Sequence, residues 1–159
     1  MSGHGAPEAT PVDGSGLVVD IVASSWHHQI MDGLITGAVR TLEADRVSHR
    51  LVRVPGCFEL AVAAQACLDS GADAVVALGV IIRGGTPHFE YVAAATTDGV
   101  NRVALDARRP VGFGVLTVDD EQQALDRAGL PGSREDKGAE AADAAVRAAL
   151  LQREILNRE

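Results

Sequence analysis

Residues 79–92 combine a group that could bind an anion with a group that could move protons. The segment reads GVIIRGGTPHFEYV, in which an apolar stretch leads through two glycines into Thr86, Pro87 and His88. A proline in this setting predicts a helix start, with Thr86 as its N-cap. Unpaired N–H groups and the positive end of the helix dipole attract phosphate, and Gly85 lets a ligand approach the backbone. His88 would lie beside the anion and, since histidine ordinarily titrates near neutral pH, could transfer protons there.

A simpler interpretation of residues 84–88 is a tight turn with an exposed histidine. Glycine and proline mark turns in proteins of every function, so the motif Gly-Gly-Thr-Pro-His is not specific by itself. The elements and residues around it must decide between a turn and a site.

Strand patterns and helix patterns alternate along the chain. Apolar stretches rich in valine and isoleucine predict four strands, at residues 17–23, 48–54, 74–82 and 111–117. Periodic apolar residues predict helices between them and a long last helix from residue 137 to about residue 157. This alternation is typical of a three-layer α/β/α protein with a four-stranded parallel sheet. Ligands of such folds bind beyond the carboxyl ends of the strands, where residues 83–88 lie.

Two further helices are expected to follow strand ends. An alanine-rich helix should run from about Phe58 to Leu68, after a Pro-Gly pair. Asp119 and Gln122 fit a capping pair for a short helix that ends near Gly129. Both helices would begin at the same edge of the sheet as the Gly-Gly-Thr-Pro-His segment.

Aromatic side chains gather near the predicted strand ends, although they make up only 3% of the chain. Trp26 in a polar loop and Phe58 after Pro-Gly are hard to explain as core residues and could stack on a planar heterocycle. Phe89 and Tyr91 lie on a predicted helix and are better explained as core. Phe113 lies within the last predicted strand.

Three charged residues could complete such a site. Glu59 could accept hydrogen bonds from ligand hydroxyls, or it could be an ordinary first-turn carboxylate of its helix. Arg127 and Lys137 flank a polar loop and could neutralise a phosphate, although single basic residues are commonly solvated surface. The two cations can serve as a phosphate site only if the fold brings them together.

Composition and motifs argue against several classes of protein. A net charge of −8 and a pI of about 5.0 disfavour nucleic acid or an anionic membrane as a partner. The longest apolar stretch, residues 74–82, is too short to span a bilayer. No Gly-x-Gly-x-x-Gly or Walker motif indicates a dinucleotide or ATP enzyme. His27 and His28 lack a third ligand at a suitable spacing, so no metal site is expected.

Residues 1–16 mix glycine, proline, serine and acidic residues and are expected to form a flexible N-terminal arm. Residues 17–159 are expected to form a single domain, and the protein is expected to be cytoplasmic. Cys57 and Cys67 show neither disulfide nor zinc spacing, so reduced thiols are expected, with Cys67 in the core. No base is evident beside Cys57, so a nucleophilic role is not favoured.

Six segments of the chain resemble the lumazine synthase family, in the same order and over nearly the whole length from about residue 17. They are Trp26 after the first strand, VPGCFE at 54–59, residues 79–92, PVGFGVLT at 110–117, QALDRAG at 123–129 and DKGAEAA at 136–142.

The resemblance implies a flavodoxin-like fold and a cofactor-independent enzyme. Its reaction would condense 5-amino-6-(D-ribitylamino)uracil with 3,4-dihydroxy-2-butanone 4-phosphate to 6,7-dimethyl-8-ribityllumazine, the penultimate step of riboflavin biosynthesis. The implied pyrimidine and ribityl contacts are the rings of Trp26 and Phe113, backbone groups of Val80, Ile81 and Ile82, and residues Cys57, Phe58 and Glu59. The implied phosphate contacts are main-chain N–H groups of Gly85 and Thr86, with Arg127 as cationic partner and Lys137 as support. His88 would be the proton shuttle.

The resemblance also implies a homo-oligomer whose active sites lie between neighbouring subunits. Family members form pentamers, and some pentamers assemble into icosahedral 60-mers. The loop at residues 130–136 is longer than the compact turn of shell formers, so a free pentamer is expected. Gly85 and Cys57 depart from the family, in which larger residues at position 85 and Ala or Ser at position 57 are usual. Both roles are mainly backbone roles, so little loss of activity is expected.

Two other functions remain open. A protein with this pocket could bind a flavin or lumazine, or form a shell, without efficient turnover. His88, Gly85, Thr86 and Arg127 favour catalysis, because a pure ring-binder would not need them. A receiver module is disfavoured because no acidic phosphoacceptor cluster follows the strands.

Overall fold

The structure, a computed structural model, describes residues 9–157. Within this range four parallel strands form one sheet in the order β2-β1-β3-β4. The strands are β1 (Val18–Ser24), β2 (Ser48–Val54), β3 (Ala74–Ile82) and β4 (Val111–Val118). The helices are α1 (His28–Ala44), η1 (Cys57–Glu59, a 3-10 turn), α2 (Leu60–Asp69), α3 (His88–Ala107), α4 (Glu121–Leu125) and α5 (Lys137–Leu156).

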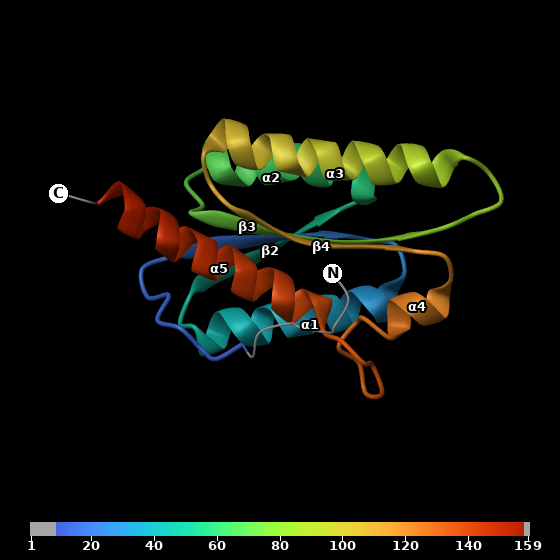
Figure 1. Ribbon diagram of the computed structural model, residues 1–159, viewed down its shortest axis with the longest axis horizontal. Helices are drawn as coiled ribbons and strands as arrows, with labels where there is room; N and C mark the ends of the chain where they lie inside the picture. Colours follow the sequence, from blue (N-terminus) through green and yellow to red (C-terminus); the bar gives the residue numbers. More distant parts are fainter. Residues whose placement is uncertain (1–8, 158–159) are drawn as a thin grey trace.

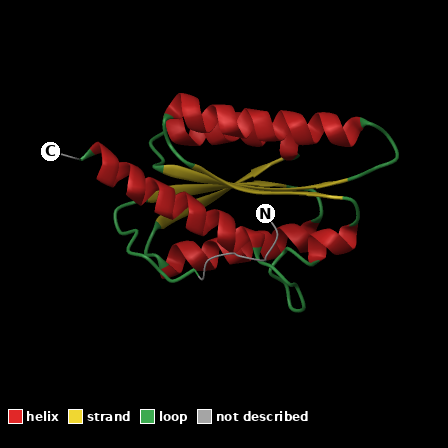
Figure 2. Cartoon of the chain, viewed as in Figure 1, coloured by secondary structure: helices red, strands yellow, loops and turns green. Residues whose placement is uncertain are grey.

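Helices cover both faces of the sheet. Figures 1 and 2 show α2 and α3 on one face and α1, α4 and α5 on the other. Each face has its own apolar core: Ile21 and Val76 belong to the core with α1 and α5, and Val22 and Val75 to the core with α2 and α3. Alternate residues of β1 and β3 therefore pack in opposite directions, as both-face burial of a parallel strand requires. The expected three-layer, flavodoxin-like fold is confirmed.

Close approach of α1 and α5 depends on glycine. A Cβ atom at Gly138 would clash with the carbonyl oxygen of Leu34, and one at Gly37 would clash with the carboxylate of Asp136. Asp136 is the N-cap of α5, where its side chain accepts a hydrogen bond of 2.9 Å from the Ala139 N–H, and it pairs with Arg40 at 2.6 Å. The start of α5, with Lys137 as its first residue, is thereby fixed against α1.

The element order and the bounds of β2 and β3 agree with the sequence-based expectations, whereas the starts of α2, α3 and α4 differ. The expected helix from Phe58 to Leu68 begins as the 3-10 turn η1 before α2. The expected capping pair of Asp119 and Gln122 is wrong by one residue. Asp120 is the extended N-cap of α4, so its carboxylate accepts from the Gln123 N–H at 2.8 Å, and Gln123 in turn accepts from the Asp119 N–H at 3.0 Å.

Half of the expected N-terminal arm lies in the described range. There, the N–H groups of Val12 and Gly14 donate to Asp45 at the end of α1, each over 2.8 Å, and Arg147 of α5 donates to the Thr10 carbonyl at 2.6 Å. Residues 1–8 lie outside the described residues, so the flexible arm stays a prediction. Among residues 9–157, no helix is long and apolar enough to cross a membrane.

Candidate active site

The sheet has an open edge where the strand order reverses between β1 and β3. Strand β1 pairs with β3 only as far as Leu78, whereas β4 pairs with β3 as far as Ile82. The last residues of β3 are therefore paired with β4 on one side and have no neighbouring strand on the side of β1. Alternate residues direct their N–H and C=O groups to this unpaired side. Such a switch point is where ligands bind in open α/β sheets.

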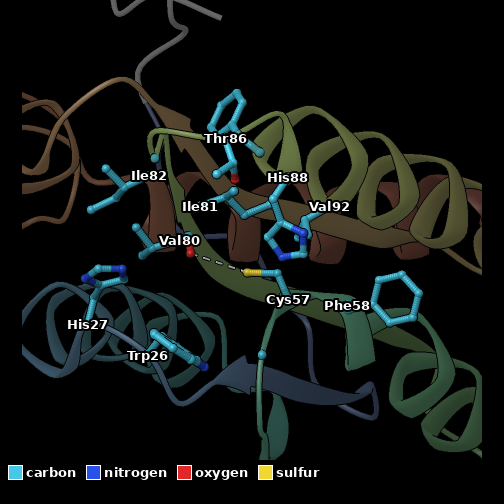
Figure 3. A pocket seen from close by; sticks show the side chains of 13 residues that line it. Trp26, His27, Cys57, Phe58, Val80, Ile81, Ile82, Thr86, His88 and Val92 are labelled. Atoms are coloured by element: carbon cyan, nitrogen blue, oxygen red, sulfur yellow. Dashed lines mark hydrogen bonds between the residues drawn. The ribbon is translucent and has the colours of Figure 1, made fainter.

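A cavity of about 370 Å³ lies at this switch point, and we call it the switch-point pocket. Figure 3 shows side chains that converge on it from the ends of β1, β3 and α3 and from η1. The lining residues are Trp26, His27, Gly56, Cys57, Phe58, Val80, Ile81, Ile82, Gly84, Thr86, His88, Phe89 and Val92. Its walls are mainly apolar. Among the described residues 9–157, no lysine or arginine lines it.

Two large rings border the pocket without being buried. Trp26 is 68% exposed and Phe58 is 66% exposed. Leaving such large apolar area in water forgoes on the order of 2 kcal/mol of burial for each side chain. Exposed rings that face a concave site provide stacking surfaces for a flat ligand.

The start of α3 supplies unpaired backbone donors. The N-cap position is Pro87, not the expected Thr86, and among the described residues no side chain caps this helix. A proline ring has no acceptor for capping, so the first N–H groups of α3 remain available to a ligand. Thr86, one residue before the helix, lines the pocket with Gly84, whereas Gly85 between them does not line it.

His88 is the first residue of α3 and is exposed to solvent. Figure 3 shows its imidazole directed into the pocket. The helix start thus presents anion donors and a titratable ring in the same cavity, which is the combination expected from the sequence.

Cys57 forms part of the floor of the pocket. Its Sγ donates to the Val80 carbonyl at 3.6 Å (Figure 3), and its own carbonyl accepts from the Thr96 hydroxyl at 3.2 Å. Burial raises the pKa of the Cys57 thiol above its usual range, against smaller opposing effects of hydrogen bonds with Ser24 and Val80. The thiol is therefore protonated at neutral pH, which fits a wall residue and not a nucleophile.

Glu59 closes the turn before α2. Its Oε2 accepts a hydrogen bond of 2.9 Å from the Gly56 N–H, and the residue does not line the switch-point pocket. One of the two roles considered for Glu59, that of a local helix-start carboxylate, is thus present in the structure. Contact with ribityl hydroxyls stays a prediction.

A second hollow, of about 460 Å³, lies along β4 and the start of α5, and we call it the edge hollow. It is lined by residues 113–118 of β4 and by Arg127, Lys137, Glu140, Ala141 and Ala144. Strand β4 is an edge strand, and the ring of Phe113 on it is 45% exposed. Within the described part of the chain, no residue lines both the edge hollow and the switch-point pocket.

The two cations of the edge hollow are held side by side by the loop before α5. The Lys137 N–H donates to the Arg127 carbonyl at 3.0 Å, and the Arg127 guanidinium donates to the Gln123 carbonyl at 2.8 Å. Lys137 Nζ also pairs with Glu135 at 2.6 Å and with Glu140 at 2.7 Å. Burial acts to lower the pKa of Lys137, but the two carboxylates outweigh it and raise that pKa. Arg127 is therefore the cation with more capacity left for an external anion.

The residues singled out from the sequence fall into two groups. Eight of them line the switch-point pocket: Trp26, Cys57, Phe58, Val80, Ile81, Ile82, Thr86 and His88. Phe113, Arg127 and Lys137 line the edge hollow, and Glu59 and Gly85 line neither. One folded chain thus does not bring all of these residues together.

Sequence reasoning missed several lining residues. His27 was considered only as a metal ligand, yet it lines the pocket with a left-handed backbone (φ 57°). The available signal was its place in the loop that follows β1, three residues after Ser24. Phe89 was assigned to the core, and both Phe89 and Val92 contact the core and the pocket. Glu140 of the edge hollow carried no signal beyond its place in the first turn of α5.

A family model and individual known proteins both match this chain, and they indicate the same family. The family model described as 6,7-dimethyl-8-ribityllumazine synthase matches residues 16–153. A protein of that name from Leifsonia xyli subsp. xyli is 67% identical, with 98% of this chain and 99% of the relative covered. Proteins of the same name from Clavibacter michiganensis subsp. michiganensis and from Nocardioides sp. are each 64% identical, with 98% of this chain and 98% and 97% of the relatives covered. The chain therefore belongs to the 6,7-dimethyl-8-ribityllumazine synthase family.

Proposed function

We propose that this protein is a transferase of riboflavin biosynthesis. It condenses 5-amino-6-(D-ribitylamino)uracil with 3,4-dihydroxy-2-butanone 4-phosphate and releases 6,7-dimethyl-8-ribityllumazine, phosphate and water. The observation that carries the proposal is the switch-point pocket, in which exposed rings, an uncapped helix start and His88 converge in a chain of this family. The reaction needs no cofactor, because its steps are imine formation, phosphate loss and ring closure.

The pyrimidine ring is assigned to the switch-point pocket. The uncovered edge of β3 at Val80, Ile81 and Ile82 offers backbone N–H and C=O groups that can pair with the polar edge of the ring. Trp26 supplies one stacking face, with Phe113 of the neighbouring copy of the chain on the other side of the ring.

The ribityl chain is assigned to the mouth of the pocket near η1. Cys57 and Phe58 line the wall there, and Glu59 is one residue further along η1. A carboxylate can accept more than one hydrogen bond, so Glu59 can hold the Gly56 N–H and a ligand hydroxyl together.

The phosphate is assigned to the start of α3 and to the cations of the edge hollow. Main-chain N–H groups at Gly85 and Thr86 and the dipole of α3 attract the anion. Arg127 neutralises the phosphate. Lys137 has only a supporting role, because the carboxylates of Glu135 and Glu140 already balance its positive charge.

His88 is assigned the proton transfers. The reaction requires several proton movements as the imine forms, phosphate leaves and the ring closes, and a placed imidazole speeds such steps by about 10²- to 10⁴-fold. Holding two substrates together supplies further acceleration, which reaches about 7 to 11 kcal/mol in ideal cases.

A complete site requires two copies of the chain. The phosphate donors and the phosphate cations lie in different hollows, so the edge hollow of one subunit must face the switch-point pocket of the next. Such a head-to-tail contact uses two different surfaces, and it closes into a ring when the rotation from one subunit to the next divides a full turn evenly. We propose a cytoplasmic homopentamer that does not assemble further. Light scattering of the purified protein should give the mass of five chains, and an icosahedral mass would overturn the free pentamer.

The function is tested by mixing the purified protein with both substrates and following the fluorescence of the lumazine product against the uncatalysed reaction. Saturable acceleration is expected. A rate equal to the uncatalysed one, with the pyrimidine still bound, would instead indicate a non-catalytic binding or shell protein.

A further inference from the structure

Arg83 lies at the junction of the two hollows without lining either. It is the first residue after β3, between Ile82 and Gly84 of the switch-point pocket. Its backbone N–H donates to the carbonyl of Val118 at the end of β4, over 2.9 Å. The proposed chemistry gives this residue no role, although its side chain makes two ion pairs and lies over the Phe89 ring.

The Arg83 guanidinium joins two segments. Its Nη1 contacts the Glu90 carboxylate at 2.5 Å, and its Nε contacts the Asp119 carboxylate at 2.9 Å. The centre of the guanidinium lies 4.2 Å from the centroid of the Phe89 ring. Glu90 and Phe89 belong to the first turn of α3, whereas Asp119 belongs to the connection from β4 to α4.

The start of α3 has few other attachments. Residues 83–88 are all exposed, and Figure 1 shows the connection from β3 to α3 extending beyond the end of the sheet. Among residues 9–157, Arg83 is the only side chain with a hydrogen bond to any residue from 84 to 92. Packing of Phe89 and Val92 on the core holds one side of the helix, and Arg83 holds its first turn.

The contacts also show what Arg83 does not do. Its Nε and Nη1 groups are engaged by two carboxylates, and these neighbours raise the pKa of Arg83 while the guanidinium lowers the pKa of Glu90. A cation balanced by two anions attracts phosphate poorly, which leaves the phosphate to the α3 donors and Arg127.

We propose that Arg83 is a positioning residue, whose contacts with Glu90, Asp119 and Phe89 fix the first turn of α3 so that the His88 imidazole faces the bound substrates. The expected fall in kcat rests on the proposed function, whereas the expected loosening of the first turn of α3 does not. Displacement of reacting groups by about 1 Å can lower a rate by about 10²-fold, so a remote attachment of this kind has a large kinetic effect.

The kinetic test compares Arg83→Gln, Arg83→Lys and Asp119→Asn with the control Arg102→Gln. Arg102 lies on the same helix and makes one exposed ion pair with Asp106 at 3.2 Å, far along the chain from His88. Arg83→Gln should lower kcat by about 10- to 100-fold with both KM values within about threefold of wild type. Arg83→Lys should recover part of the loss because an ammonium can still pair with one carboxylate, and Arg102→Gln should match wild type.

Amide hydrogen exchange gives a second readout that does not depend on turnover. Exchange of residues 86–92 should be faster in Arg83→Gln and Asp119→Asn than in wild type, and unchanged in Arg102→Gln, at equal melting temperatures. Unchanged exchange in Arg83→Gln would overturn the proposal, even if the wild type proved inactive as an enzyme. In an active wild type, an unchanged kcat in Arg83→Gln, or a selective rise in KM for the butanone phosphate, would overturn it as well.

Discussion

The switch-point pocket and the edge hollow differ in what they can bind. The first has apolar walls, an uncapped helix start and His88, with no lysine or arginine among its described lining residues. The second has two cations, Arg127 and Lys137, and the half-exposed ring of Phe113, but the helix start that borders it, that of α5, is capped by Asp136. A ligand with a flat ring and a phosphate needs features of both. In the proposed assembly each hollow is one half of a site.

The difference follows from the positions of two neighbouring strands. Strand β3 is internal, and its end is uncovered only on the side where the sheet order reverses. Strand β4 is an edge strand, and its residues 113–118 line the edge hollow. An open edge next to exposed apolar side chains is commonly covered by another chain. The fold thus favours an assembly in which the edge hollow of one copy meets the pocket of another.

The largest expected effect is that of His88→Ala, which removes the proton-transfer group of the switch-point pocket. The kcat value should fall by about 10²- to 10³-fold, with both KM values nearly unchanged, because the imidazole acts in the chemical steps. Steady-state kinetics measures this change, with His28→Ala as the control, since His28 is exposed and lines neither hollow. An unchanged kcat would remove His88 from the mechanism.

Arg127→Ala should affect one substrate selectively. The KM for the butanone phosphate should rise by about 10- to 100-fold, and the KM for the pyrimidine by less than about threefold, because only the former carries a phosphate. Lys137→Ala should have the smaller effect of the two, since Glu135 and Glu140 already pair with Lys137.

The control for the edge hollow is Arg134→Ala, whose side chain is largely exposed and does not line it. Equal increases in both KM values for Arg127→Ala would contradict a role of Arg127 in binding phosphate. They would also contradict the assignment of the phosphate cations to the edge hollow.

Trp26→Ala and Phe113→Ala should weaken binding of the same ring from opposite sides. Each should raise the KM for the pyrimidine by about three- to tenfold, since one aromatic stack is worth about 0.5–1.5 kcal/mol. Trp26→Phe should restore most of the affinity. If Phe113→Ala leaves the pyrimidine KM unchanged, the edge hollow does not contribute a stacking face.

The smallest effect is expected at Cys57. Cys57→Ala should keep kcat within about threefold of wild type, because the thiol forms a wall and its pKa is raised by burial. At pH 8 the folded protein should also alkylate at Cys57 more slowly than the unfolded protein, since the raised pKa leaves less thiolate. Mass spectrometry of the labelled peptides measures both cysteines separately, and rapid labelling of folded Cys57 would show an activated thiol.

The sequence predicted the elements that form the pocket, whereas the assembly stays a prediction. Local patterns were sufficient for β2, β3 and the Gly-Gly-Thr-Pro-His turn, because strand composition and proline restrict the backbone locally. Cap positions at Pro87 and Asp120 were missed by one residue, since neighbouring residues of similar type compete for the same cap. The ion pairs of Arg83 join residues up to 36 positions apart and have no local signal. The separation of Arg127 from His88 has no signal in residue spacing, although the family resemblance implied that these residues meet across a subunit interface.

The central claim, that two copies complete each site, is tested most directly by subunit mixing. His88→Ala has an intact edge hollow, and Arg127→Ala has an intact switch-point pocket, so each alone should be poorly active at low butanone phosphate. If the two variants are unfolded and refolded together, about a quarter of the interfaces should pair two intact halves, and about a quarter of the wild-type activity should return. Activity equal to the average of the two separate variants would contradict the account and assign the whole site to one chain.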